Sequence, residues 1–268
     1  MSTLPLVLLA TGGLVALFAA TFALSRRLDN YGIVDITWSY AFGGLAFFYA
    51  MTATGWAPRR WAIAGLVVIW SARLGTHLLR RVASHHPDED NRYKEMRTRW
   101  SENFPAKMAV FFQQQAVSVV ILGLPFLLIS RNPATAFHPL EYAGAALWLL
   151  ALLGEATADA QLKAFKHDRA NQGKVCERGL WACSRHPNYF FEWCIWVGYF
   201  VFACASPWGW TSVLCPAAML YLLLRVTGVP MAEEQSLRSR GAAYRDYQQR
   251  VSVFVPWFPK KQRVVSRR

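Results

Sequence analysis

Long apolar runs separated by short polar segments dominate the pattern of this chain. A helix of roughly 20 apolar residues is long enough to cross the ~30 Å hydrocarbon core of a bilayer. The runs of that length lie at residues 4–24, 33–54, 61–79, 107–130, 140–161, 188–205 and 208–229. The pattern therefore predicts an all-α integral membrane protein, a bundle of about seven transmembrane helices.

The chain shows no internal repeat, no low-complexity tract and no break that would separate two domains. We therefore expect a single seven-helix domain over residues 1–259. Residues 260–268 contain five Lys and Arg residues and are interpreted as a basic tail.

Basic residues are distributed unevenly among the connecting segments. Of 29 Lys and Arg residues, 23 follow the first, third and fifth runs or lie in the C-terminal segment, and 3 lie in the alternate loops. Lys and Arg are enriched in cytoplasmic loops of membrane proteins. The distribution predicts an N-terminus outside, with the basic loops and the C-terminal segment in the cytoplasm.

The composition narrows the classes of partner. The net charge of +13 would suggest nucleic acid if the basic residues lined one surface, but they are spread over loops between apolar runs. We expect contact with membrane lipids, no nucleic acid and no protein partner. The five cysteines and the His85–Asp90 loop lack the spacing of a zinc site, so no metal is predicted.

One stretch, residues 179–196, concentrates polar side chains at the start of an apolar run. Pro187 suits the first turn of a helix, which puts Asn188 and Glu192 on one face. An acid one turn inside an apolar segment is costly unless it has a partner. The stretch is either a ligand site or a charged collar at the membrane boundary. Its polar residues are Arg185, His186, Asn188, Tyr189 and Glu192.

Ionisable residues also interrupt other apolar runs. They include Asp35, Arg73, Glu155, Asp159 and Arg225. Two interpretations stay open: interhelical salt bridges, or a polar chamber open to the cytosol beneath an apolar half for a lipid-like substrate.

Loop cations allow two interpretations as well. Arg80, Arg81 and Lys166 suit phosphate recognition, and anionic lipid head groups would explain them equally well. No GxGxxG follows a strand and no GxxxxGK[ST] occurs, which disfavours soluble nucleotide-binding folds.

Several motifs of the chain resemble motifs of known membrane enzymes. The Arg185–Tyr189 run, the Glu233-Glu234 pair, Tyr244-x-x-Tyr247 and the Pro-rich end resemble the C-terminal half of the steroid 5-alpha-reductases and sterol reductases. The isoprenylcysteine carboxyl methyltransferases belong to the same superfamily. The whole chain looks most like a bacterial family of uncharacterised membrane proteins allied to the reductases, which implies a bacterial inner membrane.

The resemblance implies a membrane reductase that binds NADPH from the cytosolic side. The residues that it and the charge pattern select for the cofactor are Arg73, Arg80, Arg81, Asp159, Lys166, Arg185, His186, Asn188, Tyr189, Glu192, Trp196, Arg225, Glu233, Tyr244 and Tyr247.

The implied reaction is the reduction of an activated C=C bond, an enone, in a steroid- or isoprenoid-like lipid, as in a 3-oxo-5-alpha-steroid 4-dehydrogenase. The reductases polarise the ketone with a Glu of the second span, which follows a Gln, and with a Tyr of the third span. The second apolar run of this chain contains no such Gln-Glu pair. Asp35 and Tyr40 are the nearest polar groups and are assigned as catalytic residues. The alternatives are an S-adenosylmethionine-dependent lipid or prenyl-thiol methyltransferase, and a non-catalytic lipid-binding or transport protein.

Overall fold

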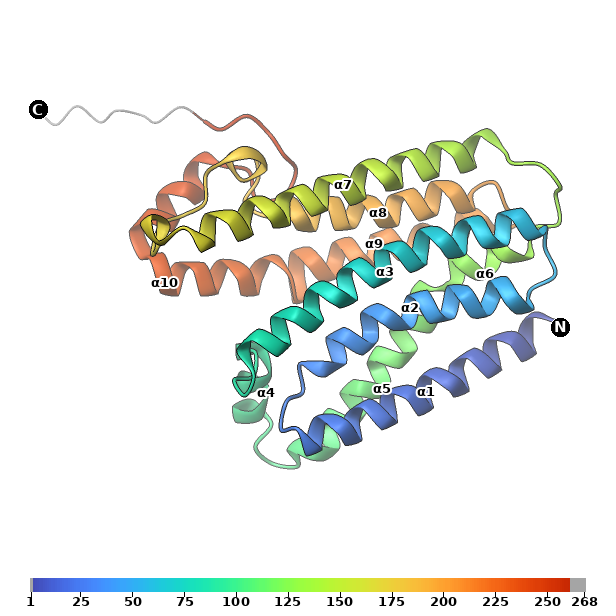
Figure 1. Cartoon of the computed structure of the whole chain (residues 1–268), viewed down its shortest axis with the longest axis horizontal. Coiled ribbons are helices and arrows are strands. Elements are labelled where there is room, and N and C mark those ends of the chain that lie inside the picture. Colours follow the sequence, from blue (N-terminus) through green and yellow to red (C-terminus); the bar gives the residue numbers. More distant parts are fainter. Residues whose placement is uncertain (1, 261–268) are drawn as a thin grey trace, which may run out of the picture. The chain divides into compact units, whose positions relative to one another are not determined.

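The computed structural model describes residues 2–260, which fold into helices with one isolated parallel bridge between Ser184 and Ser252. The helices group into two compact units (Figure 1). Unit 1 runs from the start of the described chain to His138 and includes Ala203–Gly209; unit 2 contains Pro139–Phe202 and the described chain from Trp210. That the units form one domain stays a prediction, and all of the basic tail except Lys260 lies outside the described residues.

Unit 1 is built from α1 to α6. Their bounds are α1 Thr3–Arg27, α2 Ile33–Thr52, α3 Ala57–His85, α4 Asn91–Arg99, α5 Phe104–Leu122 and α6 Leu124–Arg131. Proline occupies the first turn of α3, α5 and α6, where its missing N–H is not needed. Pro125 thus divides the predicted 107–130 run into α5 and α6.

The core of unit 1 is aromatic, and polar bridges connect its helices. The ring of Phe42 packs edge-on against Trp38 and lies 5.5 Å from the ring of Trp70. Ser71 Oγ on α3 donates to the carbonyl of Ser39 on α2 at 2.6 Å and accepts from the N–H of Gly43 at 3.1 Å. These contacts pack α2 closely against α3.

Unit 2 contains α7, α8, α9 and α10 with short helical turns between them. The bounds are α7 Pro139–His167, η1 Arg169–Asn171, η2 Gly179–Ala182, α8 Pro187–Ala203, η3 Gly209–Val213, α9 Leu214–Tyr221, η4 Leu222–Val226 and α10 Val229–Arg250. Gly144 and Gly198 let α7 and α8 approach closely, since a Cβ on Gly144 would lie 2.5 Å from the backbone nitrogen of Phe202.

The chain turns sharply inside α10, at Gly241, whose φ is +52° and ψ −120°. Glycine adopts such a left-handed conformation without steric cost. Gln248 Nε2 donates to Glu233 Oε2 at 2.7 Å across 15 residues, which a straight helix would hold about 22 Å apart along its axis. The two halves of α10 therefore fold back on each other.

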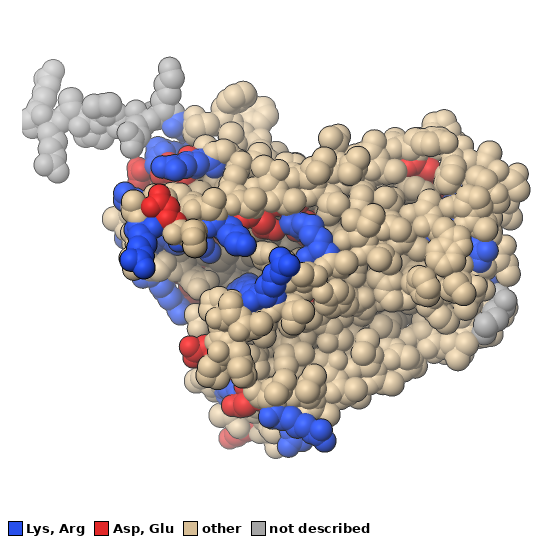
Figure 2. All heavy atoms as spheres, viewed as in Figure 1, with Lys and Arg blue, Asp and Glu red and all other residues tan. Residues whose placement is uncertain are grey.

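Within the described residues, five helical segments are long and apolar enough to cross a membrane. They are Thr3–Arg27, Ala57–His85, Phe104–Arg131, Pro139–His167 and Gly209–Arg250. Figure 2 shows helix flanks that are largely uncharged, with charged side chains gathered toward the helix ends. The protein is therefore an integral membrane protein. The other two predicted spans correspond to α2 and α8, and the count of seven and the loop sides stay predictions.

The last of these segments is too long to lie wholly within a bilayer. Its 42 residues would extend about 63 Å as one helix, twice the ~30 Å hydrocarbon thickness. Arg225 is its single charged residue before Glu233, and charged residues are frequent from there to Arg250. The crossing part therefore ends before Glu233, and most of α10 lies outside the membrane.

Candidate functional site

Helices α7 and α8 of unit 2 bring four predicted cofactor residues onto neighbouring turns. Asn188 Nδ2 on α8 donates to Asp159 Oδ1 on α7 at 3.3 Å. One turn further along α8, Glu192 is buried and its Oε1 accepts from the indole N–H of Trp196 at 3.0 Å. Glu155 is also buried, one turn before Asp159 on α7. We call Asp159, Asn188, Glu192 and Trp196 the α7–α8 polar face.

The turn before α8 is anchored to the end of α7. Gly179 has a φ of +57°, and the side chain of Gln161 occupies the space where a Cβ would lie. Gln161 Oε1 accepts from the N–H of Leu180 at 2.9 Å, and the indole N–H of Trp181 donates to the carbonyl of Ala158 at 2.9 Å. The Gly-Leu-Trp sequence thus fixes the spacing between Asp159 and the start of α8.

A second group of predicted residues surrounds the carboxylate of Glu233 on α10. Arg185 Nε donates to Glu233 Oε1 at 2.6 Å, and Tyr244 Oη donates to the same oxygen at 3.3 Å. His186 Nε2 lies 3.2 Å from that oxygen. With Gln248, these residues form the Glu233 cluster. Burial alone would raise the pKa of Glu233, but hydrogen bonds from His186, Arg185 and Gln248 lower this pKa to about 2.

Arg185 also binds the end of α10. Its Nη1 donates to the carbonyls of Gln248 at 2.9 Å and Val251 at 2.7 Å, which have no partner further along the helix. The backbone N–H of Arg185 donates to the carbonyl of Ser252 at 2.9 Å. These contacts give Arg185 a structural role that the sequence did not indicate.

Tyr247 and Ser184 complete this attachment of the C-terminal segment. Tyr247 Oη donates to the carbonyl of Trp181, and Ser184 Oγ donates to the carbonyl of Phe254 at 2.7 Å. Ser184 Oγ also accepts from the N–H of His186 at 3.1 Å at the start of α8. Ser184 and Gln248 were missed by sequence reasoning, because neither a polar side chain in a short loop nor one on a polar helix carries a distinguishing pattern.

Three further predicted residues of unit 2 lie near the ends of helices. Arg225 is in η4, a π-helical segment, and its guanidinium makes no hydrogen bond or ion pair with residues 2–260. Short π-helical segments occur frequently at functional sites. Lys166 is exposed in the last turn of α7, and the ring of Tyr189 stacks on that of His186 at 5.5 Å. Arg225 is thus available to an anionic ligand.

The residues assigned to catalysis lie in unit 1 and have protein partners. Asp35, in the first turn of α2, accepts from Arg92 Nη2 at 2.6 Å and from Tyr93 Oη at 2.9 Å. Tyr40 Oη lies 2.8 Å from Thr76 Oγ1 on α3. Asp35 thus connects α2 to α4, whereas Tyr40 connects α2 to α3.

The predicted arginines of unit 1 all lie on α3. Arg73 is half-buried and Arg80 is exposed, whereas Arg81 Nη2 binds Asp90 Oδ2 at 2.6 Å. Burial would raise the pKa of Asp90, but the nearby guanidinium and N–H of Arg92 lower it. Arg81 therefore helps to hold the segment that leads into α4.

The acidic loop between α3 and α4 is built as an ion-pair network. Glu89 accepts from the N–H of Tyr31 at 2.7 Å and from Arg97 Nε at 2.8 Å. Arg97 also binds Asp29 at 2.7 Å. No group of His, Cys, Asp and Glu within residues 2–260 could hold a metal ion.

The family model described as "Protein of unknown function (DUF1295)" matches residues 21–251. The chain belongs to this family. The matched range includes every candidate residue from Asp35 to Tyr247. No solved structure matches the chain.

A relative of this DUF1295 protein is an uncharacterized protein, C594.04c, of Schizosaccharomyces pombe. The two are 25% identical over 262 residues, which cover 88% of this chain and 75% of the relative. This relative is a fungal protein, whereas the resemblance described above was to a bacterial family. The link to steroid reductases stays a prediction.

Proposed function

We propose that this DUF1295 protein reduces an activated carbon–carbon double bond of a steroid- or isoprenoid-like lipid and takes the hydride from NADPH. The observation that supports this most directly is the α7–α8 polar face, where Asn188 contacts Asp159 and the buried Glu192 lies one turn away. These groups together donate and accept hydrogen bonds at the start of an apolar helix, which suits a planar amide or a ribose hydroxyl.

The chemistry of the side chains suggests that two groups of residues in unit 2 would bind the two ends of the cofactor. A carboxylate repels phosphate, so Asn188 and Glu192 would hold the nicotinamide end. Arg225 has a guanidinium without a protein partner in the described chain, and Lys166 is exposed, so these would hold the phosphates. NADPH, when bound, supplies the hydride, and the protein's share is orientation and electrostatic stabilisation.

The structure alters which residue we assign to the substrate oxygen. Asp35 is held by Arg92 and Tyr93, and its role is to attach α4 to α2. Tyr40 presents a hydroxyl that is partly exposed and oriented by Thr76. We assign Tyr40 to donate a hydrogen bond to the developing enolate oxygen.

The basic residue distribution supports a definite orientation. We propose seven spans, with the N-terminus outside and α10 in the cytoplasm, where soluble NADPH is available. Membrane lipids surround the helix flanks, and the substrate is itself a lipid.

The test uses the full chain in lipid nanodiscs. We expect saturable binding of NADPH, and consumption of NADPH when 4-cholesten-3-one is added. Binding of S-adenosylmethionine without NADPH would replace the proposal with a methyltransferase. Binding of 4-cholesten-3-one with neither cofactor would indicate a non-catalytic lipid-binding protein.

A further inference from the structure

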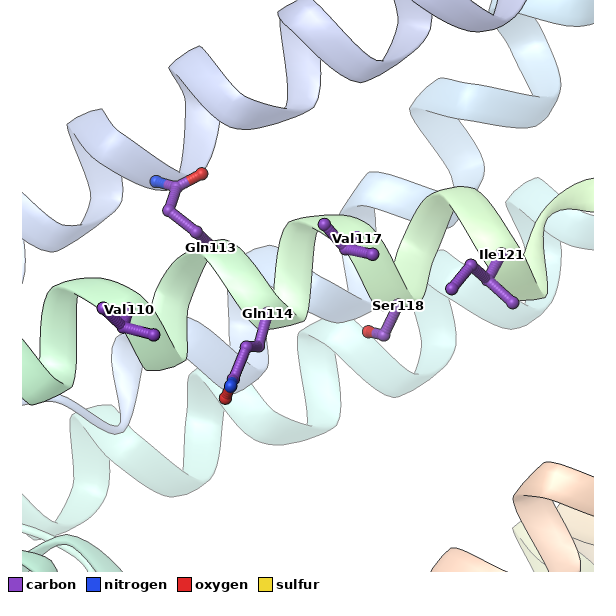
Figure 3. A pocket seen from close by; sticks show the side chains of 6 residues that line it. All are labelled: Val110, Gln113, Gln114, Val117, Ser118 and Ile121. Atoms are coloured by element: carbon purple, nitrogen blue, oxygen red, sulfur yellow. The ribbon is translucent and has the colours of Figure 1, made fainter.

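One face of α5 carries a hollow of about 350 Å³ in unit 1 (Figure 3). Its lining residues come from successive turns of that one helix; half of them are apolar, and most are exposed. They are Val110, Gln113, Gln114, Val117, Ser118 and Ile121. We call this the α5 groove.

The groove has hydrogen-bonding capacity that the protein does not use. Gln114 is exposed, and its carboxamide makes no hydrogen bond with any residue of the described chain. Gln113 Oε1 is buried and has no hydrogen-bond partner within residues 2–260, while its Nε2 lies 3.5 Å from the carbonyl of Val15 on α1. Ser118 is already used, because its Oγ accepts from the indole of Trp38 and donates to the carbonyl of Gln115.

The carboxamide of Gln114 lies at membrane depth. Helices α5 and α6 form one candidate span, Phe104–Arg131. Gln114 is ten residues from its start, about 15 Å along the axis at 1.5 Å per residue. An exposed polar group at that depth is costly, and acyl chains of ordinary phospholipids offer it no partner. A molecule with an oxygen on an apolar skeleton would satisfy it.

A second copy of the chain fits the groove less well. A two-fold interface places the same patch on both copies, so the hollow would face another hollow. Close helix pairs in membranes also rely on small residues, whereas Val110, Val117 and Ile121 are β-branched. The shape and the side chains therefore favour a small molecule.

We propose that the α5 groove binds a lipid with a compact apolar skeleton and a single ketone or hydroxyl, and that Gln114 hydrogen-bonds this oxygen. The volume lies within the ~300–1,000 Å³ range of small-molecule sites. The choice of a sterol-like or isoprenoid ligand rests on the proposed function, but binding in the groove requires no cofactor.

The test measures binding of radiolabelled 4-cholesten-3-one to the full chain in nanodiscs without NADPH. The reference probe is cholest-4-ene, which has the same skeleton without oxygen. We expect the wild type to prefer the ketone and Gln114→Leu to bind it about fivefold to tenfold more weakly, the effect of one lost hydrogen bond. Gln115→Leu is the matched control, because this neighbour does not line the groove, and it should bind as the wild type does.

Val117→Trp provides a second variant, because this exposed side chain can enlarge without disturbing the core. It should fill the groove and remove the binding of both probes at the α5 groove at an unchanged melting temperature, whereas binding at a substrate site beside Tyr40 should persist. Unchanged ketone binding in both groove variants would overturn the proposal. A wild-type dimer that Gln114→Leu converts to a monomer would also overturn it, in favour of a second copy. Ketone binding without NADPH-dependent reduction would contradict the proposed function and leave the groove supported.

Discussion

Arg185 and Glu233 lie 48 residues apart in the chain, and Arg185 Nε donates to Glu233 Oε1 at 2.6 Å. The same guanidinium binds the last carbonyls of α10, so it contacts both halves of a helix that turns back at Gly241. The pair therefore attaches the C-terminal segment to the start of α8. This attachment leaves the α7–α8 polar face as the main candidate site for a ligand in unit 2.

Removal of the Glu233 carboxylate should destabilise the protein. Glu233→Ala leaves the partly buried donors of Arg185 and Gln248 without their acceptor, and we expect the free energy of unfolding in detergent to fall by roughly 2–4 kcal/mol. Glu234→Ala is the matched control, since its partner Arg238 and Glu234 itself are largely exposed. Equal losses for the two variants would contradict the role of the cluster.

The carboxylate of Glu233 should also make the stability of the protein depend on pH in the acidic range. The pKa of Glu233 is about 2 in the folded protein and near 4.5 when the chain is unfolded. The stabilisation is therefore complete above pH 4.5 and is lost as the pH falls from 4.5 toward 2. Melting temperatures of the wild type and Glu233→Gln, measured from about pH 6 to about pH 3, should converge at the acidic end. A constant difference would show that Glu233 does not titrate in this range.

The turn inside α10 should require glycine. Gly241 has a φ of +52° and a ψ of −120°, which a side chain with a Cβ adopts only with strain. We expect Gly241→Ala to lower the free energy of unfolding by about 1–3 kcal/mol. Gly12→Ala in α1 serves as the control, because it meets no atom within 4 Å and alanine favours helix. Similar melting temperatures for the wild type and Gly241→Ala would contradict this account.

Two substitutions should show which residue binds the nicotinamide end of NADPH and which binds its phosphates. Glu192→Gln should weaken the binding of NADPH by about 1.5–3 kcal/mol, the value of a charged hydrogen bond. The binding of adenosine 2′,5′-bisphosphate should be nearly unchanged, because that ligand lacks nicotinamide. Arg225→Ala should weaken both ligands, because both carry phosphate. Arg245→Ala is the control for Arg225, as an exposed arginine elsewhere in unit 2. Equal weakening of both ligands by Glu192→Gln would mean that Glu192 acts through the fold.

The orientation can be tested at two positions. A reporter fused after Arg268 should be cytoplasmic. The Thr135→Cys variant, altered at an exposed position in the loop before α7, should react with a membrane-impermeant maleimide added outside, above the background of the native cysteines. Residues 57–60 are a poor site for a probe, because they form the first turn of α3 and Arg59 is buried there. Labelling of the Thr135→Cys variant only after the membrane is opened would reverse the topology.

The helices were determined by the sequence. Each of the seven apolar runs is helical in the structure, and five helical segments are long and apolar enough to cross a membrane, where backbone groups must be satisfied within their own segment. The spacing of Asn188 and Glu192 likewise followed from helical periodicity once Pro187 marked the start of α8. The family match and the apolar helices establish a DUF1295 membrane protein, and the reductase activity stays a proposal.

The partners of the polar side chains were decided by the tertiary structure. Periodicity placed Asp35 in a span but could not show that Arg92, 57 residues later, would bind it. It also could not show that Arg185 would bind Glu233, or that Gln114 would lie in a groove without a partner in the described chain. A local pattern fixes the face of a helix on which a residue lies. The group opposite that face depends on how separate helices pack, which involves residues far apart in sequence.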